Sequence, residues 1–219
     1  MKFEKLRKRR KRSRWIEGIF SKNPVLVLGL TLPFAIMITT NLKNAVALSI
    51  LFACTVIPTV LLVSLTSKYL PKWFMPIVYT LFAMVLVIAS APLIQPISPE
   101  IIDSLGIYIP LVSVNSVLPM MYARYSEETA KPVMALVDSV TYSVGFSLAL
   151  CLIGTVREFF GSNTLWGISI ALPIKLSGLQ IAFSGFILAA FFCALFRFIK
   201  RMMLWFAYSR LSRRAEDTV

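Results

Sequence analysis

The sequence predicts an all-α integral membrane protein with six transmembrane helices, arranged as two inverted repeats of three helices each. Three observations lead to this expectation. First, 58% of the 219 residues are hydrophobic and the mean hydropathy is +0.77, whereas soluble domains contain roughly 45–50% apolar residues. Second, six apolar segments are long enough to cross about 30 Å of hydrocarbon. Third, the first and fourth of these segments are interrupted by helix-breaking residues, so the chain divides into two halves that begin alike.

A polybasic arm, residues 1–22, precedes the first apolar segment and contains ten Lys or Arg residues. Trp15, Ile16, Ile19 and Phe20 fall on one face of a short helix, which predicts an interfacial helix that contacts the lipids of an anionic leaflet. Because the arm adjoins a membrane segment directly, we expect it to bind no nucleic acid. We expect no cleavable signal peptide, since polar residues precede the first apolar run and no small-residue cleavage site follows it.

Six expected spans follow, each bounded by polar or proline-rich sequence. The first contains Gly29, Thr31 and Pro33 within its apolar run, and the second contains Pro58, which predicts a kink. The expected spans are residues 24–40, 45–65, 73–93, 105–121, 132–156 and 179–204.

The fourth span is interrupted by Pro110, Asn115, Ser116 and Pro119. Two connectors are also expected. Proline-rich residues 94–104 are predicted to form a loop, and residues 157–178 a long and partly apolar connector.

These segments define the expected domain organisation. A membrane domain covers residues 23–204, with repeat one at 23–94 and repeat two at 105–204, and a basic tail follows at 205–219. Three helices per repeat is an odd number, so equivalent helices cross the membrane in opposite directions. We therefore expect the interrupted helices 1 and 4 to meet near the middle of the membrane.

Positive charge lies almost entirely on one side of this topology. Of the 23 Lys and Arg residues, 20 fall in the arm, the second and fourth links and the C-terminal region, and only Lys43, Arg157 and Lys175 fall on the opposite side. The positive-inside rule then places both termini in the cytoplasm.

The chain contains no histidine and three cysteines. The lack of histidine excludes imidazole ligation of haem or zinc, histidine proton relays and Ser-His-Asp catalysis. Cys54, Cys151 and Cys193 each lie in an expected span without a neighbouring cysteine, so we interpret them as packing residues. We predict no catalytic residue and no metal ligand, and the sequence leaves open whether the chain is part of an enzyme.

Asp138 is the one carboxylate placed well inside an expected span. Such an acid marks a cation path or a contact between subunits, but its position near the start of the fifth span also fits a cap or an interface residue. Thr31, Thr39, Thr40, Asn115 and Ser116 allow two interpretations as well. Their polar groups are available to a cation or water, or they satisfy the backbone groups that the prolines leave free.

Arg157 and Glu158 follow the fifth span and are candidates for contact with a neighbouring protein of a complex. Adjacent residues of a helix do not face each other. We therefore expect Arg157 to pair with an acid in a loop, such as Glu100 or Asp103.

Four stretches of the chain resemble, in the same order, the RnfE/NqrD family of bacterial membrane proteins and the related RnfA/NqrE proteins. The most specific is the pattern G-x-x-R-E-x-x-G-x-x-x-L-x-G. The stretches are NPVLV with Thr39–Thr40, Ser98–Asn115, Asp138–Leu150 and Gly154–Gly167.

The resemblance implies a six-span inverted repeat in the bacterial cytoplasmic (inner) membrane. It also implies a multisubunit complex that passes electrons between ferredoxin or NADH and NAD or quinone and moves Na⁺ or H⁺. In that family two six-helix homologues pair, and each gives one cysteine from each interrupted segment to an intramembrane [2Fe–2S] cluster. Flavins are expected elsewhere in the complex.

This chain departs from the family at the cluster ligands. The family's first motif reads GLCP, and an ungapped alignment places Pro33 at its cysteine. The second motif, VNC, is here Val114-Asn115-Ser116. Neither proline nor a neutral hydroxyl supplies the anionic thiolate that such a cluster takes, so we expect this chain to bind no cluster by itself.

The function expected from these residues is that of a membrane subunit of an Rnf/Nqr-type complex, or of a paralogous complex, without a redox group of its own. Two alternatives remain open at this point. One is a transporter of a small ion or solute on the same inverted-repeat fold, and the other is a non-catalytic assembly or scaffold subunit.

Overall fold

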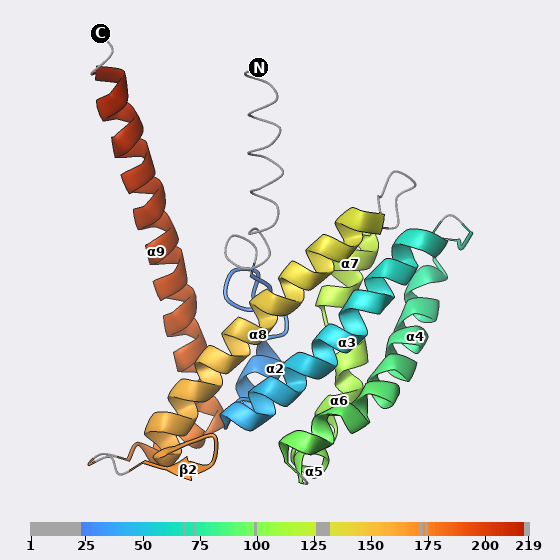
Figure 1. Ribbon diagram of the computed structural model, residues 1–219, viewed down its shortest axis with the longest axis horizontal. Helices are drawn as coiled ribbons and strands as arrows, with labels where there is room; N and C mark the ends of the chain where they lie inside the picture. Colours follow the sequence, from blue (N-terminus) through green and yellow to red (C-terminus); the bar gives the residue numbers. More distant parts are fainter. Residues whose placement is uncertain are drawn as a thin grey trace.

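The computed structural model describes residues 23–67, 69–71, 73–98, 100–125, 132–170, 173 and 175–216. The polybasic arm and interfacial helix expected at residues 1–22 lie outside these ranges. Four long helices make up most of the described chain (Figure 1). They are α3 (Leu42–Thr66), α4 (Met75–Ser90), α8 (Pro132–Ser162) and α9 (Ala182–Glu216).

These long helices confirm a mostly helical membrane fold. The 3₁₀-helix η2 (Ala91–Ile97) extends α4. Among the described residues, four segments are long and apolar enough to cross a membrane, and they match the expected second, third, fifth and sixth spans. These candidate spans are Leu42–Thr66, Met75–Ile97, Pro132–Ser162 and Ala182–Met202.

The first and fourth expected spans consist of short pieces. In the first, turns cover most of residues 24–31 before α2 (Leu32–Met37) begins. Gly29, among these turns, and Gly106, directly after α5, adopt positive φ angles of 68° and 46°, which glycine adopts more readily than other residues. The second interrupted segment contains α5 (Ile101–Leu105), α6 (Tyr108–Leu111), the 3₁₀-helix η3 (Val112–Val114) and α7 (Val117–Tyr125). Neither segment is a continuous spanning helix.

Both connectors contain more regular structure than the sequence predicted. The loop expected at residues 94–104 is wrong in part, because η2 continues to Ile97 and α5 begins at Ile101. The connector expected at 157–178 is also wrong in part, because α8 continues to Ser162. A hairpin of β1 (Thr164–Leu165) and β2 (Ile168–Ser169) follows, and then the 3₁₀-helix η4 (Ser177–Gln180).

The hairpin register pairs Thr164 with Ser169 and Leu165 with Ile168. Trp166 and Gly167 form its two-residue turn with φ angles of 58° and 80°. Positive φ at both central residues is what a type I′ hairpin turn requires.

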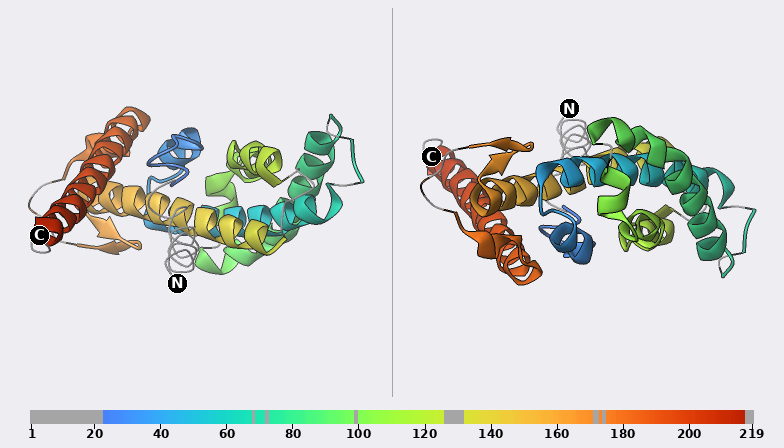
Figure 2. Two further views of the ribbon diagram at one scale, coloured as in Figure 1. Left: turned by 90° about the horizontal axis from the view of Figure 1, so that it is seen from above. Right: turned by 90° about the horizontal axis from the view of Figure 1, so that it is seen from below.

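The centre of the structure is the packing of α3 against α8, which lie side by side in Figures 1 and 2. The rings of Phe52 and Phe146 stack between them, with centroids 3.9 Å apart and planes inclined by 16°. At Gly154 the two helices approach closely, since a Cβ built there would lie 3.1 Å from Ala45 Cβ and 3.2 Å from the Asn41 carbonyl oxygen. Small residues allow this kind of approach between membrane helices.

Helix α9 leans away from α3 and α8 (Figures 1 and 2), and it contacts α2, α8 and η4. Gly185 and Ala189 are buried near its start, whereas Phe191, Leu195 and Phe198 further along are exposed. In a membrane such a face lies against lipid or against another protein of a complex.

Candidate functional site at the junction of the two interrupted segments

The two interrupted segments meet through a direct hydrogen bond. The backbone N–H of Thr31 donates to Ser116 Oγ at 3.1 Å, across 85 residues of sequence. Thr31 immediately precedes α2, and Ser116 immediately precedes α7. The sequence predicted that these segments meet, and the contact lies where each half-helix begins.

Asn115 organises the turn before α7. Its Oδ1 accepts hydrogen bonds from the N–H groups of Val117 and Leu118, at 3.0 and 3.3 Å, and its Nδ2 donates to the Val112 carbonyl oxygen. The side chain is 2% exposed. The carboxamide is therefore engaged with backbone groups at a helix start, which favours the second interpretation of Asn115, satisfaction of a broken backbone.

Asn23 has the same role at the start of the first interrupted segment that Asn115 has in the second. Its Oδ1 accepts from the N–H groups of Val25 and Leu26, at 3.0 and 2.9 Å, while its Nδ2 donates to the Gly145 carbonyl oxygen of α8 at 2.7 Å. Sequence reasoning missed this residue, although an Asn-Pro pair directly before an apolar run is a known turn signal. Asn23 fixes the entry of the chain into the membrane domain against the central helix pair.

Thr31 has φ of +60°, a left-handed conformation that is costly for a β-branched residue.

Replacing Thr31 with glycine is expected to stabilise the protein by about 0.5–1 kcal/mol, because the left-handed strain disappears while the N–H donor to Ser116 remains. The apparent midpoint of thermal unfolding of the purified protein in detergent measures this change. Thr39→Gly, at a buried position outside the left-handed region, is the control and should lower the midpoint. An unchanged or lower midpoint for Thr31→Gly would contradict the strain argument.

The chemistry at the junction does not fit an iron–sulfur cluster. Pro33 lies in the first turn of α2 and has no ligating side-chain atom, and Ser116 offers a neutral hydroxyl that already accepts a hydrogen bond. The free cysteines Cys54, Cys151 and Cys193 lie on α3, α8 and α9, and so outside both interrupted segments of the sequence. Within the described ranges, no group of three or more His, Cys, Asp or Glu side chains is placed to hold a metal ion.

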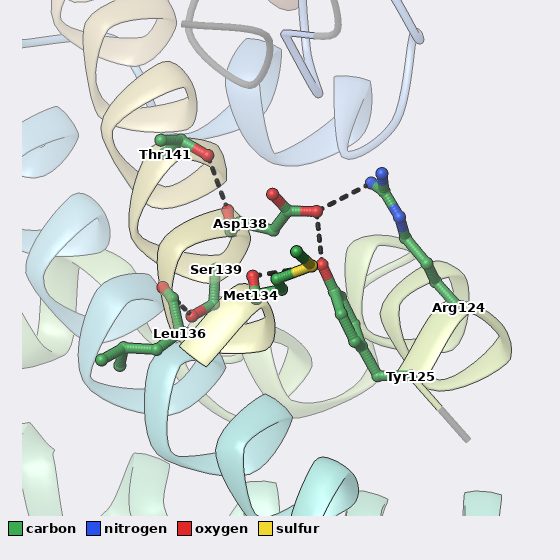
Figure 3. A network of polar contacts seen from close by, with 7 residues as sticks. All are labelled: Arg124, Tyr125, Met134, Leu136, Asp138, Ser139 and Thr141. Atoms are coloured by element: carbon green, nitrogen blue, oxygen red, sulfur yellow. Dashed lines mark hydrogen bonds and ion pairs between the residues drawn. The ribbon is translucent and has the colours of Figure 1, made fainter. Parts of the chain in front are cut away.

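Asp138 joins the start of α8 to the end of α7 (Figure 3). Arg124 Nη1 lies 3.1 Å from Asp138 Oδ2, and the Tyr125 hydroxyl donates to the same carboxylate oxygen. The Tyr125 hydroxyl also lies 3.2 Å from the Met134 carbonyl oxygen. The Asp138 side chain is 13% exposed and that of Arg124 is 36% exposed. This geometry favours the structural interpretation of Asp138.

Asp138→Leu is expected to destabilise the protein by about 1–2 kcal/mol, because it leaves the Arg124 guanidinium and the Tyr125 hydroxyl without this acceptor. Asp138→Asn keeps an acceptor for Tyr125 and should cost less. Thermal unfolding midpoints measure both, with Asp103→Asn, an exposed position on α5, as the control. Equal midpoints for Asp138→Leu and the control would contradict a joining role.

Arg157 is 1% exposed and lies against backbone carbonyls. Its guanidinium donates to the carbonyl of Ile36 near the end of α2, and to the carbonyls of residues 179–181 at 3.0 to 3.4 Å. The expected pairing with Glu100 or Asp103 is therefore wrong. A planar fork of five N–H donors can serve several carbonyls at once, so Arg157 joins α8 to α2 and to the segment directly before α9.

Glu158 is 3% exposed, and its carboxylate accepts hydrogen bonds from groups other than those that Arg157 contacts. Its Oε2 accepts from the N–H of Leu42, the first residue of α3, at 2.7 Å. Its Oε1 accepts from the Gly167 N–H at 2.9 Å and from Thr164 Oγ1 at 3.3 Å. A carboxylate at a helix N-terminus satisfies an orphan donor and complements the helix dipole. Glu158 thus joins α8 to the start of α3 and to the hairpin.

Gln180 completes the contact between α8 and the segment before α9. Its Nε2 donates to the Arg157 carbonyl oxygen at 3.0 Å and to Ser162 Oγ at 2.9 Å. A Cβ at Gly161 would lie 2.8 Å from that nitrogen, so a side chain at this position would push the Gln180 carboxamide away from its acceptors. No local sequence signal identifies Gln180, because its partners are 18 and 23 residues away.

The fold and the junction together define a multi-pass helical membrane protein with two interrupted membrane segments in contact. The sequence profile of the family described as "Rnf-Nqr subunit, membrane protein" matches residues 12–202. The chain belongs to the Rnf-Nqr family.

Three relatives carry related names. The E subunit of the "Ion-translocating oxidoreductase complex" of Shewanella oneidensis is 30% identical over 150 residues, which cover 68% of this chain and 64% of the relative. The E subunit of the "Proton-translocating ferredoxin:NAD(+) oxidoreductase complex" of Clostridium ljungdahlii is 30% identical over 158 residues, 70% of this chain and 72% of the relative. The D subunit of the "Na(+)-translocating NADH-quinone reductase" of Psychromonas ingrahamii is 28% identical over 172 residues, 78% and 81% of the two chains. The match spans less than two thirds of the Shewanella relative.

Proposed function

We propose that this chain is a membrane subunit of an ion-translocating oxidoreductase complex of the Rnf/Nqr type, or of a paralogous complex, and that it binds no [2Fe–2S] cluster of its own. One observation carries the proposal. In a chain of the Rnf-Nqr family, the two interrupted segments meet at Thr31 and Ser116, while Pro33 and Ser116 stand where the family places thiolates. The names of the relatives support the complex, and the donor atoms at the junction support a role without a redox group.

In this proposal the chain crosses the membrane six times, as two inverted repeats at residues 23–94 and 105–204. The order of elements supports it, since an interrupted segment precedes α3 and α4 in the first half and α8 and α9 in the second. The distribution of Lys and Arg supports cytoplasmic termini and a bacterial cytoplasmic membrane, with residues 1–22 against anionic lipid. A paired six-helix homologue, together with proteins that carry [2Fe–2S] and flavin groups, completes the complex.

Co-purification tests the complex. The tagged full-length chain is extracted from its native membrane in mild detergent, and the proteins that accompany it are identified by mass spectrometry. An unrelated multi-pass protein with the same tag, extracted in parallel, is the control. We expect Rnf/Nqr-like proteins only with this chain. Recovery of a homo-oligomer without them would overturn the proposal.

Iron analysis tests the lack of a cluster. The chain separated from its partners is expected to show no stoichiometric iron and no visible or EPR signal of a [2Fe–2S] centre. Ser116→Ala is the matched variant and should leave the iron content of the intact complex unchanged. Iron that is bound by the chain and lost in Ser116→Ala would assign a ligand role to this residue and overturn this part of the proposal.

The second candidate function, a transporter of a small ion or solute, is favoured by a polar cavity of about 320 Å³ at the end of the molecule that contains the hairpin. If this chain is a transporter, proteoliposomes that contain only this chain will take up the ion or solute. A subunit that works only within a larger complex will show no uptake. A non-catalytic assembly protein would show neither flux nor a place in the mature complex.

A further inference from the structure

The C-terminal part of α9 combines an exposed apolar surface with a cluster of positive charges. Of the four candidate spans among the described residues, the one in α9 is the least enclosed, with 11% of its window buried against 56% for α3. The helix also leans away from the other long helices in Figure 1. Because so little of the described chain covers α9, most of its surface is available to lipid or to another protein.

The positive charges gather where this span ends. Arg197, Lys200 and Arg201 fall in residues 197–201, and the candidate span ends at Met202. Its 21 residues rise about 32 Å as a helix, which matches the roughly 30 Å of hydrocarbon in a bilayer. We therefore expect Arg201 at the boundary between the acyl chains and the lipid headgroups.

The chain supplies no acidic side chain along α9 to neutralise these charges. The sequence contains no Asp or Glu between Glu158 and Glu216. Within the described ranges, neither Arg197 nor Arg201 forms an ion pair with a carboxylate. Charge complementarity at this end of α9 therefore favours an anionic ligand.

A cavity of about 190 Å³ adjoins Arg201. Among the described residues its lining consists of Phe198, Arg201, Met202 and Trp205. These positions are i, i+3, i+4 and i+7, so they share one face of the helix. Arginine binds phosphate oxygens through its planar fork, and tryptophan is enriched at the membrane interface. A guanidinium beside phenyl, thioether and indole groups matches a molecule that joins a phosphate to hydrocarbon chains, whereas an acidic peptide would leave the apolar lining unmatched.

We propose that this end of α9 binds an anionic phospholipid such as phosphatidylglycerol. The Arg201 guanidinium donates to the phosphate oxygens, an acyl chain lies along Phe198 and Met202, and the Trp205 indole lies at the level of the headgroup. The site uses residues of α9 and not residues 1–22, and it distinguishes anionic from zwitterionic phospholipids. It does not depend on electron transport, so the purified chain is sufficient to test it.

The test measures quenching of Trp205 fluorescence by brominated phospholipids. The chain contains four tryptophans, and the full-length chain with Trp15, Trp73 and Trp166 replaced by phenylalanine reports on Trp205 alone. It is reconstituted into vesicles of brominated phosphatidylglycerol mixed with unlabelled phosphatidylcholine, and into the reverse mixture. Bromine quenches only nearby indoles, so the two quenching curves give the relative affinity of the two lipids beside Trp205. One cation near a membrane strengthens its attraction to anionic lipid roughly fivefold, so we expect a preference for phosphatidylglycerol of that size or larger.

Arg201→Gln is expected to lower this preference to about twofold or less. Arg201→Lys keeps the charge but loses the planar fork, so it should retain part of the preference. Lys200→Gln is the matched control, because it removes the same charge from the adjacent residue, which does not line the cavity. It should retain most of the preference. Equal losses in Lys200→Gln and Arg201→Gln would indicate a general attraction of the basic helix end and would overturn the proposed site.

Three other outcomes contradict the proposal. Equal quenching by the two lipids before any change at Arg201 would show that the site does not recognise anionic headgroups. Loss of the preference when inorganic phosphate replaces chloride at constant ionic strength would assign the arginine to free phosphate. A lack of quenching by either lipid would show that something other than lipid covers this end of α9. Trp205 is exposed, so if the three phenylalanine replacements prevent folding, subtracting the signal of Trp205→Phe from that of the intact chain isolates the same residue.

Discussion

Arg157→Ala is expected to lower the free energy of unfolding by about 3 kcal/mol or more, the largest loss of any substitution considered. The truncation removes the Arg157 donors from the carbonyls of Ile36, Leu179 and Gln180, and each buried group left unsatisfied costs about 1–3 kcal/mol. Thermal unfolding in detergent or nanodiscs measures the loss. Contacts from α8 to both α2 and the segment directly before α9 disappear together, so the effect should exceed that of an ordinary buried hydrogen bond.

Arg157→Lys keeps the charge but replaces the planar fork with a single ammonium, so it should recover only part of the loss. Arg197→Ala on exposed α9 is the control for removal of an arginine. If Arg157→Ala and Arg197→Ala unfold at the same temperature, the carbonyl contacts contribute little and the role assigned to Arg157 is wrong.

The second largest effect is expected for Glu158→Ala, which should destabilise the protein by about 2–3 kcal/mol. The substitution leaves the N–H groups of Leu42 and Gly167 without their acceptor and removes a negative charge from the start of α3. Glu158→Gln retains one carbonyl oxygen and should lie between the wild type and Glu158→Ala.

Glu100→Gln, a change at an exposed carboxylate that lines the same polar cavity as Glu158, is the matched control for loss of a negative charge. Proteolysis near the hairpin offers a second readout, because Gly167 is one of the groups that Glu158 holds. A Glu158→Ala protein with the midpoint and cleavage rate of the Glu100→Gln protein would show that α3 and the hairpin do not depend on this carboxylate.

The long helices could be predicted from the sequence because their signal is local. Uninterrupted apolar runs identified α3, α4, α8 and α9, and Gly29 together with the prolines identified the two interruptions. The predicted end of the fifth span is too early, because charged residues such as Arg157 and Glu158 usually mark the edge of a membrane segment. They are accommodated within α8 because each is satisfied by a distant part of the chain.

The contacts of the candidate site could be predicted only in part. The meeting of the two interrupted segments followed from the repeat pattern, but its chemistry, a Thr31 N–H to Ser116 Oγ bond, depends on a left-handed residue that the sequence does not signal. An arginine in a membrane protein is usually expected to pair with a carboxylate, so the sequence led us to predict an acidic partner for Arg157. Backbone carbonyls carry no residue-specific signal, so the actual contact could not be predicted from residue types.

The hydrogen bond from Arg157 to the Ile36 carbonyl also bears on how this chain could diverge. The end of α2 is fixed by the hydrogen bond from Arg157 of α8, and its start by the contact between Thr31 and Ser116. None of these bonds uses the side chain at position 33. A mutation there changes the chemistry offered at the junction while the surrounding backbone keeps its supports. Selection on the fold and selection on the residue at position 33 can therefore act separately. A lineage can replace the residue at this position and keep the fold.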